Sequence, residues 1–264
     1  MKIAVSGKGG TGKTTIAGTI ARLWTRAGRR VLAIDADPNP NMSVILGLPR
    51  DQAFDLTPIP RNMAEWREDP GGRAYVHLHL PVAEIERLYG IPTPDNVTLL
   101  VTGRIEQAGV GCMCDPHAIA RGLIMRVNAE ADDVVTDMEA GLEHLSRGTV
   151  EYVDALLIVV EPYYRSLETG ARAHDLAAQL GVPRLYAVAN KVRTDNERQA
   201  IADFCARHEM ELVAAIPYDE TMPQADQLGL SPLELAPNAP AIQAIRALAD
   251  DLEHRVNTRS NSNE

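Results

Sequence analysis

The sequence is poor in aromatic side chains and has no excess of positive charge. Its 264 residues include two Trp, two Phe and seven Tyr, and 36 Asp and Glu outnumber 26 Lys and Arg, for a formal net charge of -10. An acidic chain has no broad electrostatic attraction to nucleic acid or anionic lipid. We therefore expect neither nucleic acid nor membrane among its partners.

Long hydrophobic runs are absent as well. No run approaches the roughly 18 apolar residues that a membrane-spanning helix needs, and the N-terminal stretch MKIAVSGKGG has no long hydrophobic region with a cleavage site. These absences predict a cytoplasmic protein.

Cysteine is scarce, and its placement is uneven. Cys112 and Cys114 stand one residue apart in GVGCMCDPHAI, whereas Cys205 falls in a predicted amphipathic helix, where a buried small hydrophobic side chain is expected. In a reducing compartment, a close thiol pair is more typical of metal binding or redox chemistry than of a disulfide.

Short aliphatic and β-branched runs alternate with helical patterns along most of the chain. Continuous apolar runs separated by helices are typical of strands buried on both faces of a mainly parallel sheet, so we predict a doubly wound α/β fold. We expect one domain over residues 1–264, interrupted by an irregular, proline-rich insertion at about 50–96. The predicted strands are KIAVS, RRVLAID, NVTLLVTG, DDVVTDM, DALLIVVE, RLYAVANK and ELVAAIP.

The strongest motif is GKGGTGKTT, which directly follows the first predicted strand and opens a helix. It matches the phosphate-binding pattern G-x-x-x-x-G-K-[ST] in the strand-loop-helix context that this pattern requires. Glycines let successive backbone N–H groups surround phosphate oxygens, Lys13 adds a full charge, and Thr14 offers a hydroxyl to Mg²⁺. The predicted nucleotide-binding residues here are Gly7, Gly9, Gly10, Thr11, Gly12, Lys13, Thr14 and Thr15.

Carboxylates follow two other predicted strands at the edge where this loop would lie. Asp35 ends RRVLAID, Asp37 is the second residue of the following ADPNPN, and Asp137 ends the strand in DDVVTDMEAG. Such groups can hold the hydration shell of Mg²⁺ or orient an attacking water. The alternative is that they only cap turns.

Two later strands end in polar residues at the same edge. VANKV supplies Asn190 and Lys191, and AIPYDE supplies Pro217 and Asp219. In a doubly wound fold, a nucleotide base would lie there. These residues could also be ordinary polar strand ends.

Lys8 is not required by an ordinary phosphate-binding loop. With this second lysine, the motif resembles the deviant Walker A motif of the ATPase family that includes MinD, ParA and the nitrogenase iron protein. The resemblance implies that two chains sandwich two ATP molecules and that Lys8 reaches the partner's phosphates, as an arginine finger does. It further implies catalytic roles for Lys13, for Asp37 in positioning water and for Asp137 in sensing the γ-phosphate.

The thiol pair fits such a dimer. Soft four-coordinate metal sites want four ligands, and a two-fold axis near Cys112 and Cys114 would bring four sulfur atoms around one ion. Other interpretations stay open: an inert pair, Zn²⁺ held within one chain with His117, or an iron–sulfur cluster at the interface. The spacing of His77 and His79 in VHLHL could also suit a metal, although a surface hairpin is the expected explanation.

Several stretches resemble one branch of the family, the CooC-type ATPases that assist nickel insertion into carbon monoxide dehydrogenase. These stretches are GKGGTGKTT, DADPN, GCMC with DPHA, TDMEAGLEHLSRGT, EPYYRSLETGA, ANKV and IPYDE. The resemblance implies a homodimer that binds ATP, Mg²⁺ and, at the shared cysteines, Ni²⁺ or Zn²⁺, with apo carbon monoxide dehydrogenase as its client. Alternatives are a spatial organiser of the MinD or ParA kind and an iron–sulfur electron donor.

Overall fold

The computed structural model describes residues 1–53, 55–72, 74–103, 114–127, 133–142, 145 and 148–257. Within them, eight strands form one sheet in the order β10-β9-β8-β1-β7-β2-β6-β5, and all neighbours are parallel except β5 and β6. The strands are β1 (Lys2–Gly7), β2 (Val31–Ala36), β5 (Ile91–Pro92), β6 (Thr98–Val101), β7 (Asp133–Met138), β8 (Ala155–Val160), β9 (Leu185–Val192) and β10 (Glu211–Pro217). This arrangement confirms the predicted doubly wound, mainly parallel sheet.

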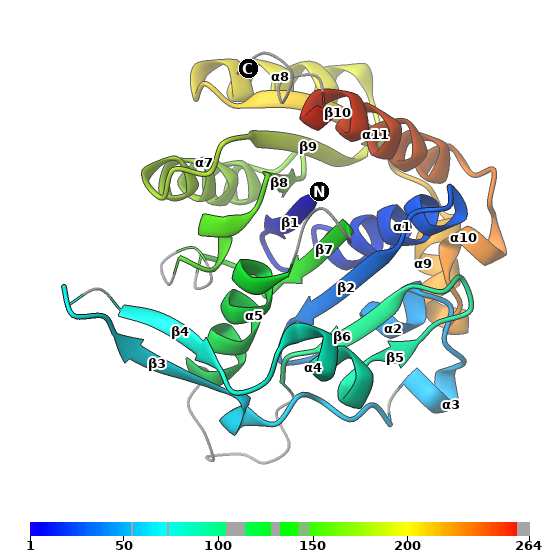
Figure 1. The fold of residues 1–264 in the computed structure, drawn as a ribbon. Coiled ribbons are helices and arrows are strands. Elements are labelled where there is room, and N and C mark those ends of the chain that lie inside the picture. Colours follow the sequence, from blue (N-terminus) through cyan, green and yellow to red (C-terminus); the bar gives the residue numbers. More distant parts are fainter. Residues whose placement is uncertain are drawn as a thin grey trace.

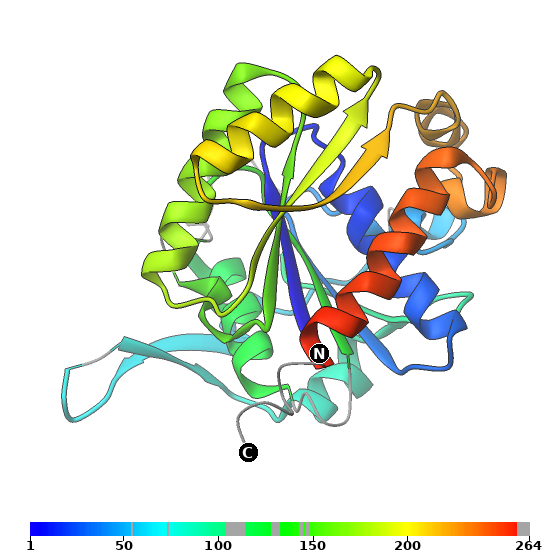
Figure 2. The same cartoon turned by 90° about the horizontal axis from the view of Figure 1, so that it is seen from above.

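Helices cover both faces of the sheet (Figures 1 and 2). One face carries α1 and α11, and the other carries α5, α7 and α8. The larger helices are α1 (Lys13–Arg26), α5 (Cys114–Arg126), α7 (Tyr164–Gln179), α8 (Asp195–Arg207) and α11 (Pro240–Asn257), and the shorter ones include α2 (Met42–Ile45), α9 (Thr221–Leu228), α10 (Pro232–Leu235) and η2 (Thr149–Tyr152).

The central strands are apolar on both faces because each face has its own core. In β1, Ile3 and Val5 belong to the core under α1 and α11, whereas Ala4 between them belongs to the core under α5 and α7. Successive side chains of a strand point to opposite faces, so a strand covered on both sides must be apolar throughout. This is the physical origin of the run KIAVS.

Residues 50–96 have more regular structure than the sequence led us to expect. They form α3 (Arg50–Ala53), η1 (Arg61–Met63), β3 (Ala64–Glu68), β4 (Ala74–Leu78), α4 (Val82–Tyr89) and the edge strand β5. Strands β3 and β4 pair as an antiparallel hairpin that projects from the body and contacts α5 (Figure 2). Each element is short, eight residues at most, so none of them shows a sustained hydrophobic period.

His77 lies in β4 and its ring meets that of His79 edge to face at 5.5 Å. Among the described residues, no group of three or more His, Cys, Asp or Glu side chains is arranged to hold a metal ion. The hairpin explanation of VHLHL therefore fits the structure.

Helix α11 packs along the body through its apolar face. Ile242, Ile245 and Leu252 are buried in the core that α1 shares, and the indole N–H of Trp24 donates to the carbonyl of Ala249 at 3.3 Å. Across the part of the chain that is described, no helix combines the length and apolar character needed to cross a bilayer.

Candidate nucleotide-binding site

The phosphate-binding loop joins β1 to α1 and folds back on itself. The Thr11 hydroxyl donates to the carbonyl of Lys8 at 2.8 Å, and Nζ of the buried Lys13 donates to the same carbonyl at 3.3 Å. Gly12, which caps α1, has φ +92°, and a Cβ there would lie 2.4 Å from Nδ2 of Asn190. The loop therefore needs glycine at Gly12 for both its backbone conformation and its close packing.

Asn190 and Lys191, at the end of β9, hold the outside of this loop. Asn190 Nδ2 donates to the Thr11 carbonyl at 2.7 Å, and Lys191 Nζ donates to the Gly10 carbonyl at 2.6 Å. Lys191 Nζ also pairs with Glu161 Oε1 at 2.6 Å. Because side chains bind these carbonyls, the loop is fixed, and its peptide N–H groups other than that of Thr11, which donates to the Lys8 carbonyl, can meet phosphate oxygens.

A mostly apolar slot of about 80 Å³ adjoins the loop. The four residues predicted to lie near a base, Asn190, Lys191, Pro217 and Asp219, all line it, together with Ile16, Ile216, Met222, Pro223 and Ala241. The structure thus brings the predicted strand ends together at one edge of the sheet. A slot with apolar walls and a few polar groups beside a phosphate loop has the chemistry to hold a nucleobase.

Asp219 holds together two chain segments that line this slot. Its carboxylate accepts the amide N–H and the hydroxyl of Thr221 at 2.9 and 2.7 Å, and the amide N–H of Ala241 at 3.3 Å. Burial raises the pKa of Asp219, but these hydrogen bonds outweigh it and hold the pKa below its usual value. The ionised side chain therefore joins the loop after β10 to the start of α11.

A larger groove of about 360 Å³ begins at Thr14 and Thr15 and shares Thr15 and Met222 with the slot. It continues between α2 and the α9–α10 turn, where Asn41, Arg50 and Leu230 are among its lining residues. The sequence analysis did not identify Asn41, Met222 or Glu161. Glu161 directly follows β8, so the same reasoning about strand ends would have found it.

Asp35 and Asp137 are register neighbours on adjacent parallel strands, and both are buried. Asp35 accepts the amide N–H groups of Asp37, Asn41 and Met42 at 3.1, 3.0 and 2.9 Å, so it shapes the loop after β2. Burial raises the pKa of Asp35 to about 6, with the charge of Asp37 acting in the same direction and the amide hydrogen bonds opposing it.

Asp137 faces the first turn of α1. Burial and the charge of Asp35 raise its pKa well above the usual value, although a hydrogen bond with the Thr14 side chain and the charge of Lys13 oppose the shift. Its Oδ1 accepts no hydrogen bond from the described residues. Buried carboxylates with raised pKa values beside a hydroxyl form an oxygen-rich, electronegative site that a hard divalent cation would stabilise.

Asp37 and Lys8 lie at the more open side of the loop. Asp37 is half-buried, its Oδ1 accepts the Asn39 amide N–H at 2.8 Å, and its charge contributes to the raised pKa of Asp137. The side chain of Lys8 is exposed. Three carboxylates therefore gather near Thr14, and Lys8 lies in the exposed part of the phosphate loop.

The thiol pair lies largely outside the described residues. Cys112 is outside them, and Cys114 is described only as the first backbone position of α5, so metal binding by the two side chains stays a prediction. Nε2 of the buried His117 lies 3.1 Å from Glu139 Oε2. Cys205 is buried, and burial raises the pKa of its thiol, in agreement with an inert core cysteine.

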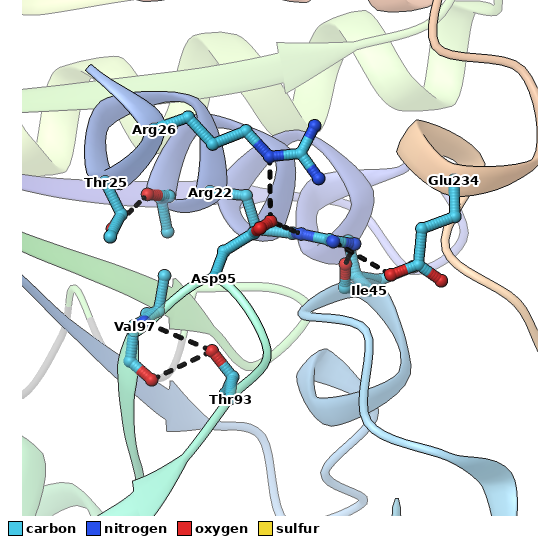
Figure 3. A network of polar contacts seen from close by, with 9 residues as sticks. Arg22, Thr25, Arg26, Ile45, Thr93, Asp95, Val97 and Glu234 are labelled. Carbon is cyan, nitrogen blue, oxygen red and sulfur yellow. Dashed lines mark hydrogen bonds and ion pairs between the residues drawn. The ribbon is translucent and has the colours of Figure 1, made fainter. Parts of the chain in front are cut away.

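An ionic cluster around the buried Arg22 fixes the middle of α1 (Figure 3). Arg22 pairs with Asp95 at 2.5 Å and Glu234 at 2.8 Å, and it donates to the Ile45 carbonyl at 3.2 Å. Arg26 pairs with the same Asp95 at 2.9 Å. The helix that carries Lys13 and Thr14 is thereby joined to α2, to the turn before β6 and to α10.

Comparison with known proteins agrees with this geometry. The sequence family described as the CobQ/CobB/MinD/ParA nucleotide binding domain matches residues 2–233. The carbon monoxide dehydrogenase accessory protein CooC of Rhodospirillum rubrum is 39% identical to this chain over 242 residues, which cover 90% of this chain and 91% of CooC.

Solved structures share the fold at low sequence identity. The septum site-determining protein MinD of Pyrococcus horikoshii, in complex with Mg-ADP, superposes with a TM-score of 0.73 and 20% identity and covers 97% of both chains. Cobyrinic acid a,c-diamide synthase of Mycobacterium smegmatis, with a bound ATP analogue and magnesium, superposes with a TM-score of 0.63 and 21% identity. The match covers 95% of this chain and 93% of the synthase.

Proposed function

This chain belongs to the CobQ/CobB/MinD/ParA family of nucleotide-binding ATPases, and from that premise we propose that it is a CooC-type ATPase that assists nickel insertion into carbon monoxide dehydrogenase. The observation that carries the proposal is the 39% identity with a carbon monoxide dehydrogenase accessory protein over nine-tenths of the chain. The cysteine pair, where soft metal ions would bind, supports it.

In this proposal, the described residues bind ATP and promote its hydrolysis. The base enters the slot beside Asn190 and Pro217, and the loop N–H groups, Lys13 and the N-terminus of α1 neutralise the phosphates. Thr14 and the neighbouring carboxylates would hold Mg²⁺ together with the phosphate oxygens. Magnesium would supply positive charge that offsets the negative charge of the phosphates.

Asp37 and Asp137 have different roles in the hydrolysis step. Asp37 is the more accessible of the two, and we assign it the positioning of the attacking water. Asp137 is buried against Thr14, so it responds to the charge that arrives with the nucleotide. Gly141, four residues further on, donates its amide N–H to the Gly7 carbonyl at 3.2 Å, which joins the segment after β7 to the phosphate loop.

The metal-handling step requires a second copy of the chain. Lys8 is exposed in the phosphate loop, where it can reach phosphates bound to a partner. The same two-fold arrangement would bring Cys112 and Cys114 together with their copies. Ni²⁺ is then the cargo, held by four thiolates, and Zn²⁺ can take its place because it accepts the same ligands.

Metal analysis of anaerobically purified protein tests this proposal. Wild-type protein supplied with Ni²⁺ or Zn²⁺ should retain one ion per two chains, and Cys112→Ser should retain none. Cys205→Ser is the matched control, because it removes the buried thiol of α8 and should leave the metal content unchanged. If Cys112→Ser still retained one ion per two chains, the shared thiolate site would be wrong.

A further inference from the structure

Helix α5 lies directly beside the chain that leaves β7 (Figure 1). His117 is in the first turn of this helix, three residues after Cys114, and only 1% of its surface is exposed. Its Nε2 meets Glu139 Oε2 at 3.1 Å. A partly buried polar contact therefore joins the start of α5 to Glu139, two positions after Asp137.

The opposite side of the same segment contacts the phosphate loop. The Gly141 amide N–H donates to the Gly7 carbonyl, and the Cβ of Ala140 would lie 3.6 Å from a Cβ placed at Gly9. Residues 139–141 thus lie between the nucleotide-binding loop and the first turn of α5. A displacement of this segment cannot leave both neighbours unchanged, because packed interiors transmit strain.

The remainder of α5 is held firmly by its neighbours. Ile119, Leu123 and Ile124 are fully buried in the core, and Arg121 pairs with Glu151 of η2 at 2.6 Å. Near the other end, Pro116 packs so closely on Gly103 that a Cβ there would lie 2.6 Å from Pro116 Cγ. Because the rest of the helix is anchored, a shift at His117 acts on the first turn of α5, whose first residue is Cys114.

We propose that the His117–Glu139 pair couples the nucleotide site to the thiol pair. Binding and hydrolysis of ATP shift residues 138–141, and the pair passes this shift to the first turn of α5 and so to Cys114. His117 and Glu139 are positioning residues, since they act through the chain segments that they join. The inference rests on the proposed metal-handling function and assigns the route by which ATP controls it.

Coupling between two sites is reciprocal and can be measured as a ratio of affinities. The experiment determines the affinity for Zn²⁺, by competition with a chelator, without nucleotide and with a non-hydrolysable ATP analogue and Mg²⁺. The wild-type ratio of the two affinities should lie in the range of about 5- to 150-fold that is usual for coupled sites. In His117→Leu and Glu139→Ala the ratio should fall several-fold, toward the part that dimerisation alone contributes, whereas Glu139→Gln, which retains a hydrogen-bonding group, should keep most of the wild-type ratio.

The matched control breaks the other ion pair of the same helix. Glu151→Gln should leave the coupling ratio unchanged, because it acts at η2 and not at residues 138–141. Should His117→Leu fail to fold, Glu139→Ala carries the test, since the Glu139 side chain is 25% exposed and its replacement leaves no large cavity. Within each variant, the ratio of the affinities for the ATP analogue with and without Zn²⁺ should equal the ratio measured for Zn²⁺ with and without the analogue.

The outcomes separate this inference from the proposed function. Wild-type protein that binds no Zn²⁺ at its cysteines contradicts the proposed function itself. Wild-type protein that binds Zn²⁺ with a coupling ratio of one overturns the inference, as does an unchanged ratio in both His117→Leu and Glu139→Ala. The latter result would mean that ATP and metal are linked through dimerisation alone. An equal fall of the coupling ratio in Glu151→Gln would also overturn the inference, because the ratio would then depend on the stability of α5 and not on this pair.

Discussion

Replacing Arg22 by methionine tests how the helix of the phosphate-binding loop is held in place. The substitution keeps an unbranched side chain but removes the guanidinium that joins Asp95, Glu234 and the Ile45 carbonyl. Arg22 is only 1% exposed and the Asp95 side chain 18%, so water cannot replace the lost contacts fully.

The size of the effect follows from this burial. Removing one partner of a buried ion pair costs about 3–5 kcal/mol when the other charge is left unpaired, and the lower end applies here because Arg26 still pairs with Asp95. The lost pair with Glu234 adds little to this cost, since the Glu234 side chain is 39% exposed. In a chain of this length, each kcal/mol lowers the melting temperature by about 2–4 °C. Arg22→Met should therefore melt roughly 6–12 °C below the wild type in thermal scans followed by circular dichroism.

Arg26→Met is the matched control, because Arg26 pairs with the same Asp95 from a side chain that is 42% exposed. We expect it to cost less than about 1 kcal/mol. Equal losses in the two variants, or a loss below about 1 kcal/mol for Arg22→Met, would refute the reasoning from burial.

The dependence of stability on pH in the acid range is a further check on the same cluster. Burial raises the pKa of Asp95, but Arg22 and Arg26 outweigh it and hold the pKa below its usual value. A carboxyl with a lowered pKa stabilises the fold above the pKa of the unfolded chain, and this stabilisation is lost as the pH falls through the folded pKa. The difference between wild type and Arg22→Met should therefore shrink below about pH 4.

Three other substitutions address the nucleotide site. Gly12→Ala should lower the free energy of unfolding by about 2–5 kcal/mol, because it places a Cβ on a left-handed backbone and displaces Asn190, and it should weaken ATP binding in calorimetry by more than about tenfold. Its control is Gly28→Ala, which has a similar φ but open space around it. This variant should lose only about 1–2 kcal/mol and bind ATP as the wild type does. Asp137→Asn should abolish hydrolysis yet raise the melting temperature of nucleotide-free protein. This gain in melting temperature should grow with pH, because a carboxyl whose pKa is raised on folding destabilises the fold as it ionises. A gain that is the same at pH 5 and pH 8 would contradict the raised pKa. Asp219→Ala should weaken ATP binding several-fold but leave inhibition by tripolyphosphate unchanged, and equal effects on both ligands would show that it acts on the phosphates rather than on the base slot.

Much of the site could be predicted because parallel strands end at one edge of a sheet. The positions of Asp35, Asp137 and Asn190 after apolar runs were enough to expect them near the phosphate-binding loop, and the structure places them there. The loop itself could be predicted because its glycines and Lys13 must be contiguous in sequence to surround a phosphate group.

Contacts between distant segments could not be predicted in this way. The partners of Arg22 lie 73 and 212 residues away in sequence, and no local pattern marks Asp95 or Glu234 as different from other surface carboxylates. His117 was expected only as a first-turn residue or as a possible zinc ligand, and its contact with Glu139 depends on how α5 packs beside β7. The surface hairpin expected at VHLHL is present, but β3 was not identified as its second strand, because five-residue strands show too few alternations to establish a period.

The proposed mechanism requires two chains to join face to face when ATP and metal are present. The molar mass in solution, measured by light scattering with a non-hydrolysable ATP analogue, Mg²⁺ and Zn²⁺, should be twice the 28.7 kDa of one chain for the wild type. It should stay near 28.7 kDa when Lys8→Ala and Cys112→Ser are combined. A wild-type protein that remains a single chain under these conditions, or a double variant that pairs as readily as the wild type, would contradict the account.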